Sequence, residues 1–535
     1  MGGSAFSSGA YSLSTPRMPP RVYSVIRERC HALLRELFLC VATPIEGPEK
    51  RDFGDIDLMV ALEKRMVFPS TPADQADRPP IETLKVVQTV LGAEFAIFEP
   101  AGNAANMAIP WPEDLLETAY ASTEVTSSLH GTTDNSASIQ EVEPDGDRRH
   151  QKQAHLSSLS YVQVDVRICS SSDELQWLLF KHAHGDFWNI VGTSIRPLGL
   201  TLDERALWLR IPEIEAANRK RSRIYLCDDP ATVLSFLGFD PSSRVWEEPF
   251  AALEDLFDYV TTSKWFAVPP ESWWDDEPSS QNVEGAANGR IKKLKSNDRR
   301  RMKHRPGFRA WIEDYLPKLR KSGKFPCRSA SLPLVQQPVD HEVLVGLMTD
   351  SQNTTVTSLT PNNEGCSTSD ATSEAPTPRS HGQMLRSIVR EAAFVRFGPT
   401  VRAEYAERLH HWMVETQRDL IRREIIRSAV SIDNYSPAFR ACAIRALRRV
   451  VLEEPQISIT AGEDNKALRP FTTLAAAKGI RLSDGLYDVQ ATREFVNSTW
   501  ENIAKVAWDI HLDKENSKRL RSPIKRGPDH LYWKD

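Results

Sequence analysis

The stretch "KRDFGDIDLMV" (residues 50–60) decides how this chain is interpreted, because two motifs overlap in it. One is D-F-G at 52–54, and the other is G-D-I-D at 54–57; both types of motif occur at magnesium-dependent phosphate sites. On a β-strand, Asp55 and Asp57 project from one face, and the apolar residues that alternate with them project from the other. The stretch therefore predicts a strand with a buried apolar face and a pair of carboxylates on its polar face.

The D-F-G motif would belong to a kinase-like phosphotransfer centre, where a catalytic loop with an Asp and a later Asn precedes it in the chain. The similar loop here, "HAHGDFWNIV" at 182–191, follows the D-F-G motif instead. Asn189 also follows Asp186 more closely than in the kinase motif. This alternative requires Asp186 to lie beside Asp52 in one cleft.

The G-D-I-D motif gains support from a second stretch, "YVQVDVRIC" at 161–169, which is the clearest strand pattern in the chain. Its valines alternate with polar residues, and Asp165 is the acid on the polar face. Neighbouring like charges on strands repel one another unless a cation lies between them. Two-metal phosphoryl transfer uses a carboxylate pair of this kind with a third acid from a neighbouring strand. Asp55, Asp57 and Asp165 are therefore candidate ligands of Mg²⁺ or Mn²⁺.

Three stretches in this order resemble the palm of family X DNA polymerases and the related polymerase-β-like nucleotidyltransferase superfamily. They are "GDIDLMV" (54–60), "VQVDVRI" (162–168) and "LQWLLFKHAHGDFWNIVGTSIRPLGLTLDERAL" (175–207). The resemblance rests on the order and spacing of motifs and covers roughly residues 22–210. It implies an α/β (α+β) palm with a mixed sheet, and transfer of a nucleotide from an NTP or dNTP to a hydroxyl acceptor.

The resemblance also implies roles for individual residues. Asp55, Asp57 and Asp165 would be the catalytic, metal-binding acids. The residues that would bind the nucleoside triphosphate are Gly54, Lys50, Arg51, Lys181, Gly185 and Asn189.

One motif of that superfamily is missing. A Gly-Ser pair that holds the nucleotide's phosphates is expected before the first Asp, where this chain has "ATPIEGPEK" (42–50), with Pro44-Ile45 at the position of the pair. Proline lacks the backbone N–H that such a phosphate-binding turn uses. The departure favours an alternative in which the chain is a catalytically inactive member of the fold that binds nucleic acid or protein.

A second candidate site is the basic stretch "RIKKLKSNDRRRMKHR" (290–305), which could contact phosphate backbones or act as a nuclear import signal. It could equally be the solvated start of a helix. The residues expected to touch nucleic acid are Lys292, Lys293, Lys295, Arg299, Arg300 and Arg301.

Composition sets the limits. The chain has 535 residues and a net charge of -5, so any attraction to nucleic acid has to be local. Its seven cysteines form no C-x-x-C pair, which indicates neither a zinc ribbon nor a disulfide framework. No secretory signal or membrane span is evident, so we expect no membrane partner and an intracellular location, nuclear or cytoplasmic.

Composition and periodicity also predict the order of the parts. Polar, Pro- and Gly-rich segments bury too little apolar surface to fold, and helical periodicity dominates the C-terminal part. The expected parts are a disordered tail (1–19), a nucleotidyltransferase-like domain (20–268) with a disordered insert (120–157), a linker (269–289), a basic helical segment (290–330), a disordered linker (350–381), a mainly helical region (382–515) and a basic tail (516–535).

Overall fold

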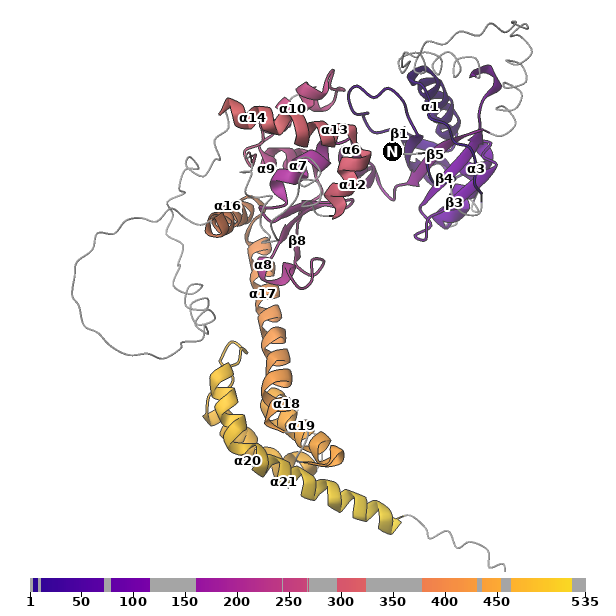
Figure 1. The fold of residues 1–535 in the computed structure, drawn as a ribbon. Helices are drawn as coiled ribbons and strands as arrows, with labels where there is room; N and C mark the ends of the chain where they lie inside the picture. Colours follow the sequence, from indigo (N-terminus) through magenta and orange to yellow (C-terminus); the bar gives the residue numbers. More distant parts are fainter. Residues whose placement is uncertain are drawn as a thin grey trace, which may run out of the picture. The chain divides into compact units, whose positions relative to one another are not determined.

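The structure is a computed structural model of the chain (Figure 1). It describes residues 3–7, 11–71, 78–115, 160–242, 244–266, 268, 296–323, 378–430, 435–453 and 463–521. The chain forms two compact units: one comprises residues 1–210 and 223–398, and the other comprises residues 211–222 and 399–535. Each unit is treated separately below.

The first unit contains a five-stranded mixed sheet with the strand order β1-β2-β5-β4-β3 (Figure 1). The strands are β1 (Phe38–Ala42), β2 (Asp55–Glu63), β3 (Phe95–Phe98), β4 (Ala104–Pro110) and β5 (Tyr161–Ile168). β2 and β5 are parallel, whereas the other pairs are antiparallel. The mixed sheet expected from the sequence is therefore present, and β3 is an additional strand.

One face of this sheet is apolar and forms the core. The alternating residues Ile56 and Leu58 of β2 and Val164 of β5 are almost completely buried. They belong to a cluster that includes residues of α1 (Pro20–Arg35) and α3 (Pro80–Val90). This face carries the period-two apolar pattern, so the opposite face of the sheet carries the polar residues of the same strands.

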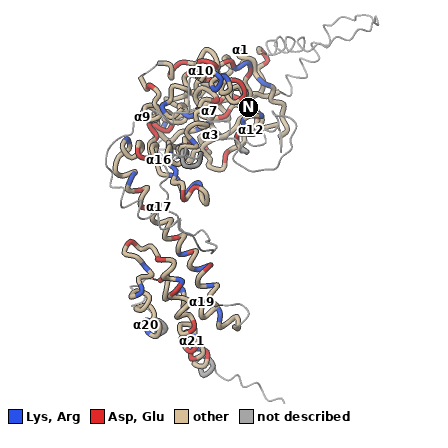
Figure 2. The backbone as a smooth tube through the Cα atoms, turned by 60° about the vertical axis from the view of Figure 1, so that its left-hand side comes forward, with Lys and Arg blue, Asp and Glu red and all other residues tan. Residues whose placement is uncertain are grey.

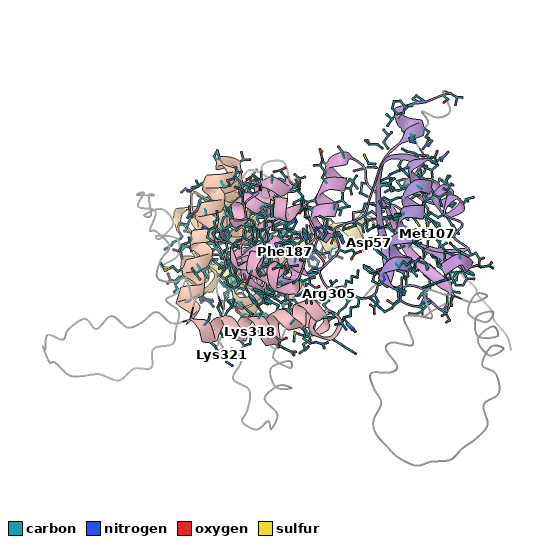
Figure 3. The ribbon with its side chains drawn as sticks, turned by 90° about the horizontal axis from the view of Figure 1, so that it is seen from above. Asp57, Met107, Phe187, Arg305, Lys318 and Lys321 are labelled. Atoms are coloured by element: carbon teal, nitrogen blue, oxygen red, sulfur yellow. The ribbon has the colours of Figure 1, made fainter. Side chains whose placement is uncertain are left out.

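The rest of the first unit combines a small sheet with helices. Strands β6 (Leu200–Leu202), β7 (Leu207–Arg210) and β8 (Arg223–Cys227) form an antiparallel three-stranded sheet. The helical elements that precede or follow it are α2 (Lys64–Val67), η2 (Glu113–Leu115), α6 (Ser172–His182), α7 (Phe187–Ile195), α9 (Pro230–Leu237), η3 (Arg244–Trp246), α10 (Leu253–Thr261), α12 (Ser296–His304), α13 (Pro306–Ala310), a π-helical turn (Trp311–Tyr315), α14 (Leu316–Ser322) and α16 (Pro378–Phe397). At the start of α7, Phe187 is fully buried in a cluster of aromatic rings (Figure 3).

The second unit is helical, as expected for the C-terminal region. It contains α8 (Pro212–Glu215), α17 (Pro399–Leu420), a π-helical turn (Ile421–Ile426), α18 (Arg427–Ala429), α19 (Pro437–Leu452), α20 (Glu463–Ala477) and α21 (Val489–Arg521). Its core joins residues of α19, α20 and α21. Acidic and basic residues both occur along α17 (Figure 2). Within the described residues, no helix is long and apolar enough to cross a membrane.

The N-terminal segment differs from the expectation of a disordered tail over residues 1–19. Phe6 is fully buried, Ser14 forms a β-bridge with Ser160, and Met18 forms one with Phe53. We use the term N-terminal segment for residues 3–18, of which 8–10 lie outside the described part. Composition did not indicate this packing, because the segment is rich in Ser and Gly and only a few aromatic residues anchor it.

Several other expected segments lie wholly or mostly outside the described residues, and one expected boundary is shifted. The insert at 120–157, the linker at 269–289 and the tail residues 522–535 lie outside the described residues. Most of the linker at 350–381 does so as well, and helix α16 begins at Pro378. The first unit extends to residue 398, beyond the expected start of the helical region at 382, and it includes the described residues of the basic segment 290–330.

Leu58→Ala tests the core of the sheet. Leu58 is 1% exposed, so truncation creates a cavity that should lower the free energy of unfolding by about 2–5 kcal/mol. Urea unfolding followed by circular dichroism measures this loss. Leu39→Ala is the matched control, because Leu39 is 41% exposed and its truncation should change stability by less than about 0.5 kcal/mol. Equal effects of the two variants would contradict this assignment of the core face.

Candidate functional site

The register of β2 and β5 brings the three predicted acids onto one face of the sheet. Asp57 lies directly opposite Asp165, and Asp55 lies two residues before Asp57 on the same face. Asn106 of β4 lies opposite Asp165 on its other side. Figure 3 shows Asp57 on the sheet together with Met107, which is buried in the core of the opposite face. Two strands separated in sequence therefore supply a single group of carboxylates.

This polar face is covered at both ends and open between them. Helix α6 contacts β2, and Met59, which lies on the same face, is buried. At the other end, the N-terminal segment covers Gln163, which is 3% exposed. Asp57 lies between these covered parts and is exposed. A ligand can therefore reach the carboxylates from solvent.

Burial raises the pKa of all three carboxylates, and the charge of Asp55 raises the pKa of Asp57 and Asp165 further. Burial, followed by the charge of Asp55, raises the pKa of Asp165 to about 8. Burial and then the same neighbour raise the pKa of Asp57 to about 6, although part of the Asp57 side chain meets solvent. The pKa of Asp55 is also raised, mainly by burial. Ionising all three groups is unfavourable without a compensating cation, which is the electrostatic condition expected of a metal site.

The donor chemistry of this face fits a hard divalent cation, because carboxylate and amide oxygens are the ligands that Mg²⁺ and Mn²⁺ prefer. The side-chain positions do not form a closed ligand set. Among the described residues, no group of three or more His, Cys, Asp or Glu side chains is placed so that it could hold a metal ion. Binding would therefore require rotation of carboxylates that already share one face.

The loop before β2, where the Gly-Ser pair was expected, is packed differently. Pro44 is buried, and the Lys50 ammonium lies 2.7 Å from Glu46, which also accepts a hydrogen bond from the Tyr23 hydroxyl. The predicted phosphate-binding Lys50 is thus neutralised by Glu46. Arg51 is exposed in the last part of the connection between β1 and β2. The loop offers less positive charge than the resemblance implied.

The same loop contacts the turn after α6. The Ile45 carbonyl accepts a 2.7 Å hydrogen bond from the His184 backbone N–H, and Gly47 packs against Gly185. Gly185 has a φ of 63°, and a Cβ there would lie 3.0 Å from the Cα of Gly47. His184 itself is fully buried and bonds the Trp246 carbonyl, so its ring is structural. The predicted nucleotide-facing turn therefore adjoins the loop that precedes the acids.

Lys181 and His182 lie at the end of α6, beside β2. His182 is 2.9 Å from Glu204, and its charge acts on Asp57. Burial lowers the pKa of Lys181, with further lowering from Arg305. Lys181 is therefore a partly buried cation whose charged neighbours include Glu204 and Arg305, and none of the three acids is among the groups that shift its pKa.

Asn189 is engaged elsewhere. Its Oδ1 accepts a 3.0 Å hydrogen bond from Arg301, and its amide nitrogen lies 3.4 Å from Asp186. Asp186 in turn accepts hydrogen bonds from Arg305 and from the Phe308 backbone. These contacts join α7 to α12 and α13. The structure therefore places Asn189 in a helix-docking network, and not in contact with the three acids.

The basic stretch divides into structural and exposed residues. Arg301 binds Asp298 at 2.6 Å as well as Asn189, so it is a structural residue. Arg299 and Arg300 are exposed on α12, as is Lys303. The predicted contacts Lys292, Lys293 and Lys295 lie outside the described residues.

The kinase alternative is not supported. Asp52 pairs with Arg17 at 2.6 Å, whereas Asp186 pairs with Arg305 at 2.8 Å, so the two acids have separate partners. Phe53 of the D-F-G motif stacks on Tyr23 with ring centroids 3.8 Å apart and belongs to the sheet core. The G-D-I-D motif is the one whose acids converge with another strand.

Sequence reasoning missed two participants. Asn106 is one of them, because its pairing with Asp165 depends on a β4–β5 register that periodicity does not reveal. Gln163 is the other: it is one of the polar residues that alternate with the valines of β5, but the sequence does not indicate its partner Ala5 in the N-terminal segment. The alternation of β5 was the one available signal for Gln163.

The raised pKa values predict a pH-dependent stability. Asp165 has a folded pKa of about 8, above its unfolded value of 3.8, so the folded state retains a proton that the unfolded state releases. In EDTA, stability should therefore fall as the pH rises through this interval. Asp165→Asn should flatten the fall, as measured by thermal unfolding between pH 5 and pH 8.

Asp114→Asn is the control for this experiment. Asp114 is a surface acid whose pKa is lowered by its hydrogen bond to Arg29, so it titrates below the tested interval. It should retain the wild-type pH profile. A wild-type profile in Asp165→Asn as well would contradict the raised pKa of Asp165.

Comparison with known proteins gives limited information. No protein-family model matches the chain, and no curated protein matches it. Two solved structures of Leishmania infantum polymerase beta show similarity at 13% sequence identity and a TM-score of 0.25. The match to the ternary P/T complex covers 43% of this chain and 77% of the polymerase chain. The match to the ternary gap complex covers 43% of this chain and 71% of the polymerase chain. A TM-score at this level does not establish a shared fold, so the nature of the site rests on its own residues.

Proposed function

We propose that the chain is a diverged, metal-dependent nucleotidyltransferase that transfers a nucleotide from an NTP or dNTP to a hydroxyl acceptor. The observation that carries this proposal is the placement of Asp55, Asp57 and Asp165 on one solvent-accessible sheet face. Their mutual repulsion provides a reason for a divalent cation to bind there.

The acids and Lys181 would have different roles in this reaction. Asp55, Asp57 and Asp165 would hold Mg²⁺ or Mn²⁺, which when bound would stabilise negative charge on phosphoryl oxygens and lower the pKa of a hydroxyl nucleophile. Lys181, in the last turn of α6, would neutralise phosphate charge in this proposal.

A second candidate function has its own observation. Pro44 occupies the place of the phosphate-binding pair, and Lys50 is neutralised by Glu46, so two expected contacts to a triphosphate are weakened. A non-catalytic module that binds nucleic acid through the exposed side of α12 would not need them. The three neighbouring carboxylates favour the catalytic function over this one, because they repel one another when no cation is bound.

Nucleotide incorporation tests the first function. Purified protein is incubated with Mg²⁺ or Mn²⁺, labelled NTPs and dNTPs, and a pool of DNA and RNA primers. Asp57→Ala and Asp165→Ala should each lower incorporation at least about a hundredfold, because each removes a ligand for a charge-stabilising cation.

Asp52→Asn is the matched control for incorporation. Asp52 is two residues before Gly54 but pairs with Arg17 at the surface, so its loss should leave the rate within about twofold of wild type. Incorporation that survives both Asp57→Ala and Asp165→Ala would exclude this site as its source. Absence of incorporation by the wild type across metals and acceptors would favour the binding-module function.

Charge reversal on α12 tests that second function. Arg300→Glu and Lys303→Glu together should weaken binding to single-stranded DNA or RNA and reduce the dependence of log K on log salt by about 1 for each phosphate group that is no longer neutralised. Fluorescence anisotropy across a salt series measures both quantities. Lys85→Glu, a charge reversal at an exposed position of α3, should have little effect. Weakening in Lys85→Glu in proportion to its smaller change in net charge would show that only the net charge matters.

A further inference from the structure

The side chain of Gln163 connects the N-terminal segment to the carboxylate face. Its Oε1 accepts a 3.0 Å hydrogen bond from the Ala5 backbone N–H, and its Nε2 donates a 2.8 Å hydrogen bond to Asp165 Oδ1. Gln163 is 3% exposed, so this amide is largely removed from water. Breaking either hydrogen bond of this buried amide costs free energy, because it leaves an unsatisfied polar group.

The orientation of this amide is determined by the N-terminal segment. A backbone N–H can only donate, so the Gln163 oxygen has to face Ala5, and the amide nitrogen is thereby directed at Asp165. Asp165 is an acceptor at this contact, and its Oδ2 has no hydrogen-bond partner among the described residues. The seated segment therefore directs the amide N–H at Asp165, which engages one carboxylate oxygen and leaves the other for another ligand.

The N-terminal segment is itself anchored beside the acids. Gly3 lies against the backbone of Gly54, the residue that precedes Asp55, so closely that a Cβ on Gly3 would lie 2.3 Å from the Gly54 carbonyl oxygen. The Thr15 hydroxyl donates a 2.6 Å hydrogen bond to the Gly3 carbonyl. Phe6 is fully buried and contacts the Tyr11 ring. These contacts seat the segment on the polar face of the sheet.

We propose that Gln163 is a positioning residue through which the N-terminal segment sets the Asp165 carboxylate, and that the carboxylate face binds a divalent cation best while the segment is seated. Gln163 acts through Asp165 and is not itself a ligand. The cation-binding part of this inference rests on the proposed function. The link between Ala5, Gln163 and Asp165 does not depend on any cation.

Hydrogen–deuterium exchange on the full chain in EDTA tests the link. Gln163→Leu removes both hydrogen bonds and Asp165→Ala removes one, so both should speed exchange of the amides in residues 3–7, by about tenfold for Gln163→Leu. Exchange at the wild-type rate in either variant would overturn the link. Thermal unfolding measured in parallel identifies any variant that has lost the fold.

Isothermal titration with Mn²⁺ alone at pH 8 tests the positioning role. Gln163→Leu should weaken Mn²⁺ binding about tenfold, the effect expected for a residue that orients a ligand. Gly3→Ala should act in the same direction, because its new Cβ forces the segment away from Gly54 without removing a functional group. The matched control is Gly92→Ala: Gly92 has a φ of 67° but nothing within 4 Å, so Mn²⁺ affinity should not change.

A double variant tests whether Gly3 and Gln163 act through the same connection. Gly3→Ala with Gln163→Leu should bind Mn²⁺ no more weakly than the weaker single variant, because both changes break one connection. Additive losses, or wild-type affinity in both single variants, would overturn the positioning role. If the wild type does not bind Mn²⁺, the proposed cation site is refuted, and with it the role of Gln163 in positioning a cation ligand. The exchange data would still test the hydrogen-bonded link between Ala5, Gln163 and Asp165.

Discussion

The placement of Asp57 and Asp165 beside the charge of Asp55 on one sheet face is the constraint on which the site depends. Two carboxylates opposite one another on neighbouring parallel strands are about 4.8 Å apart at the backbone, and part of their hydration is removed. The apolar partners of these strands are buried against α1 and α3 and hold the register, so the acids cannot separate without loss of the core. The strain at the polar face is thus maintained by packing on the opposite face.

The surroundings of the acids moderate the repulsion from Asp55 without cancelling it. Lys50 and His182 each lower the pKa of Asp57, but Lys50 is shared with Glu46 and His182 with Glu204. Both side chains are therefore shared between Asp57 and another acid. The face keeps an excess of negative charge, which is the property that a divalent cation would correct.

The sequence predicted this face well because period-two alternation is a local signal. The alternation placed Asp55, Asp57 and Asp165 on polar faces, and the structure brings those faces together. Contacts between residues far apart in the chain could not be predicted from this local pattern. The pairing of Asn189 with Arg301 joins residues far apart in the chain, and the seat of the N-terminal segment depends on contacts such as that of Gly3 with Gly54. Composition suggested disorder there, because short Ser- and Gly-rich stretches bury little apolar surface on average.

The helical second unit is discontinuous in sequence, since it includes residues 211–222 as well as the C-terminal helices. Within that unit, Arg221 pairs with Glu415 at 2.7 Å and its guanidinium lies 5.3 Å from the centre of the Trp412 ring. These residues connect the β7–β8 loop to α17. The second unit is therefore built from two separate pieces of the chain, and a fragment beginning at residue 399 would lack the contacts that Arg221 makes with α17.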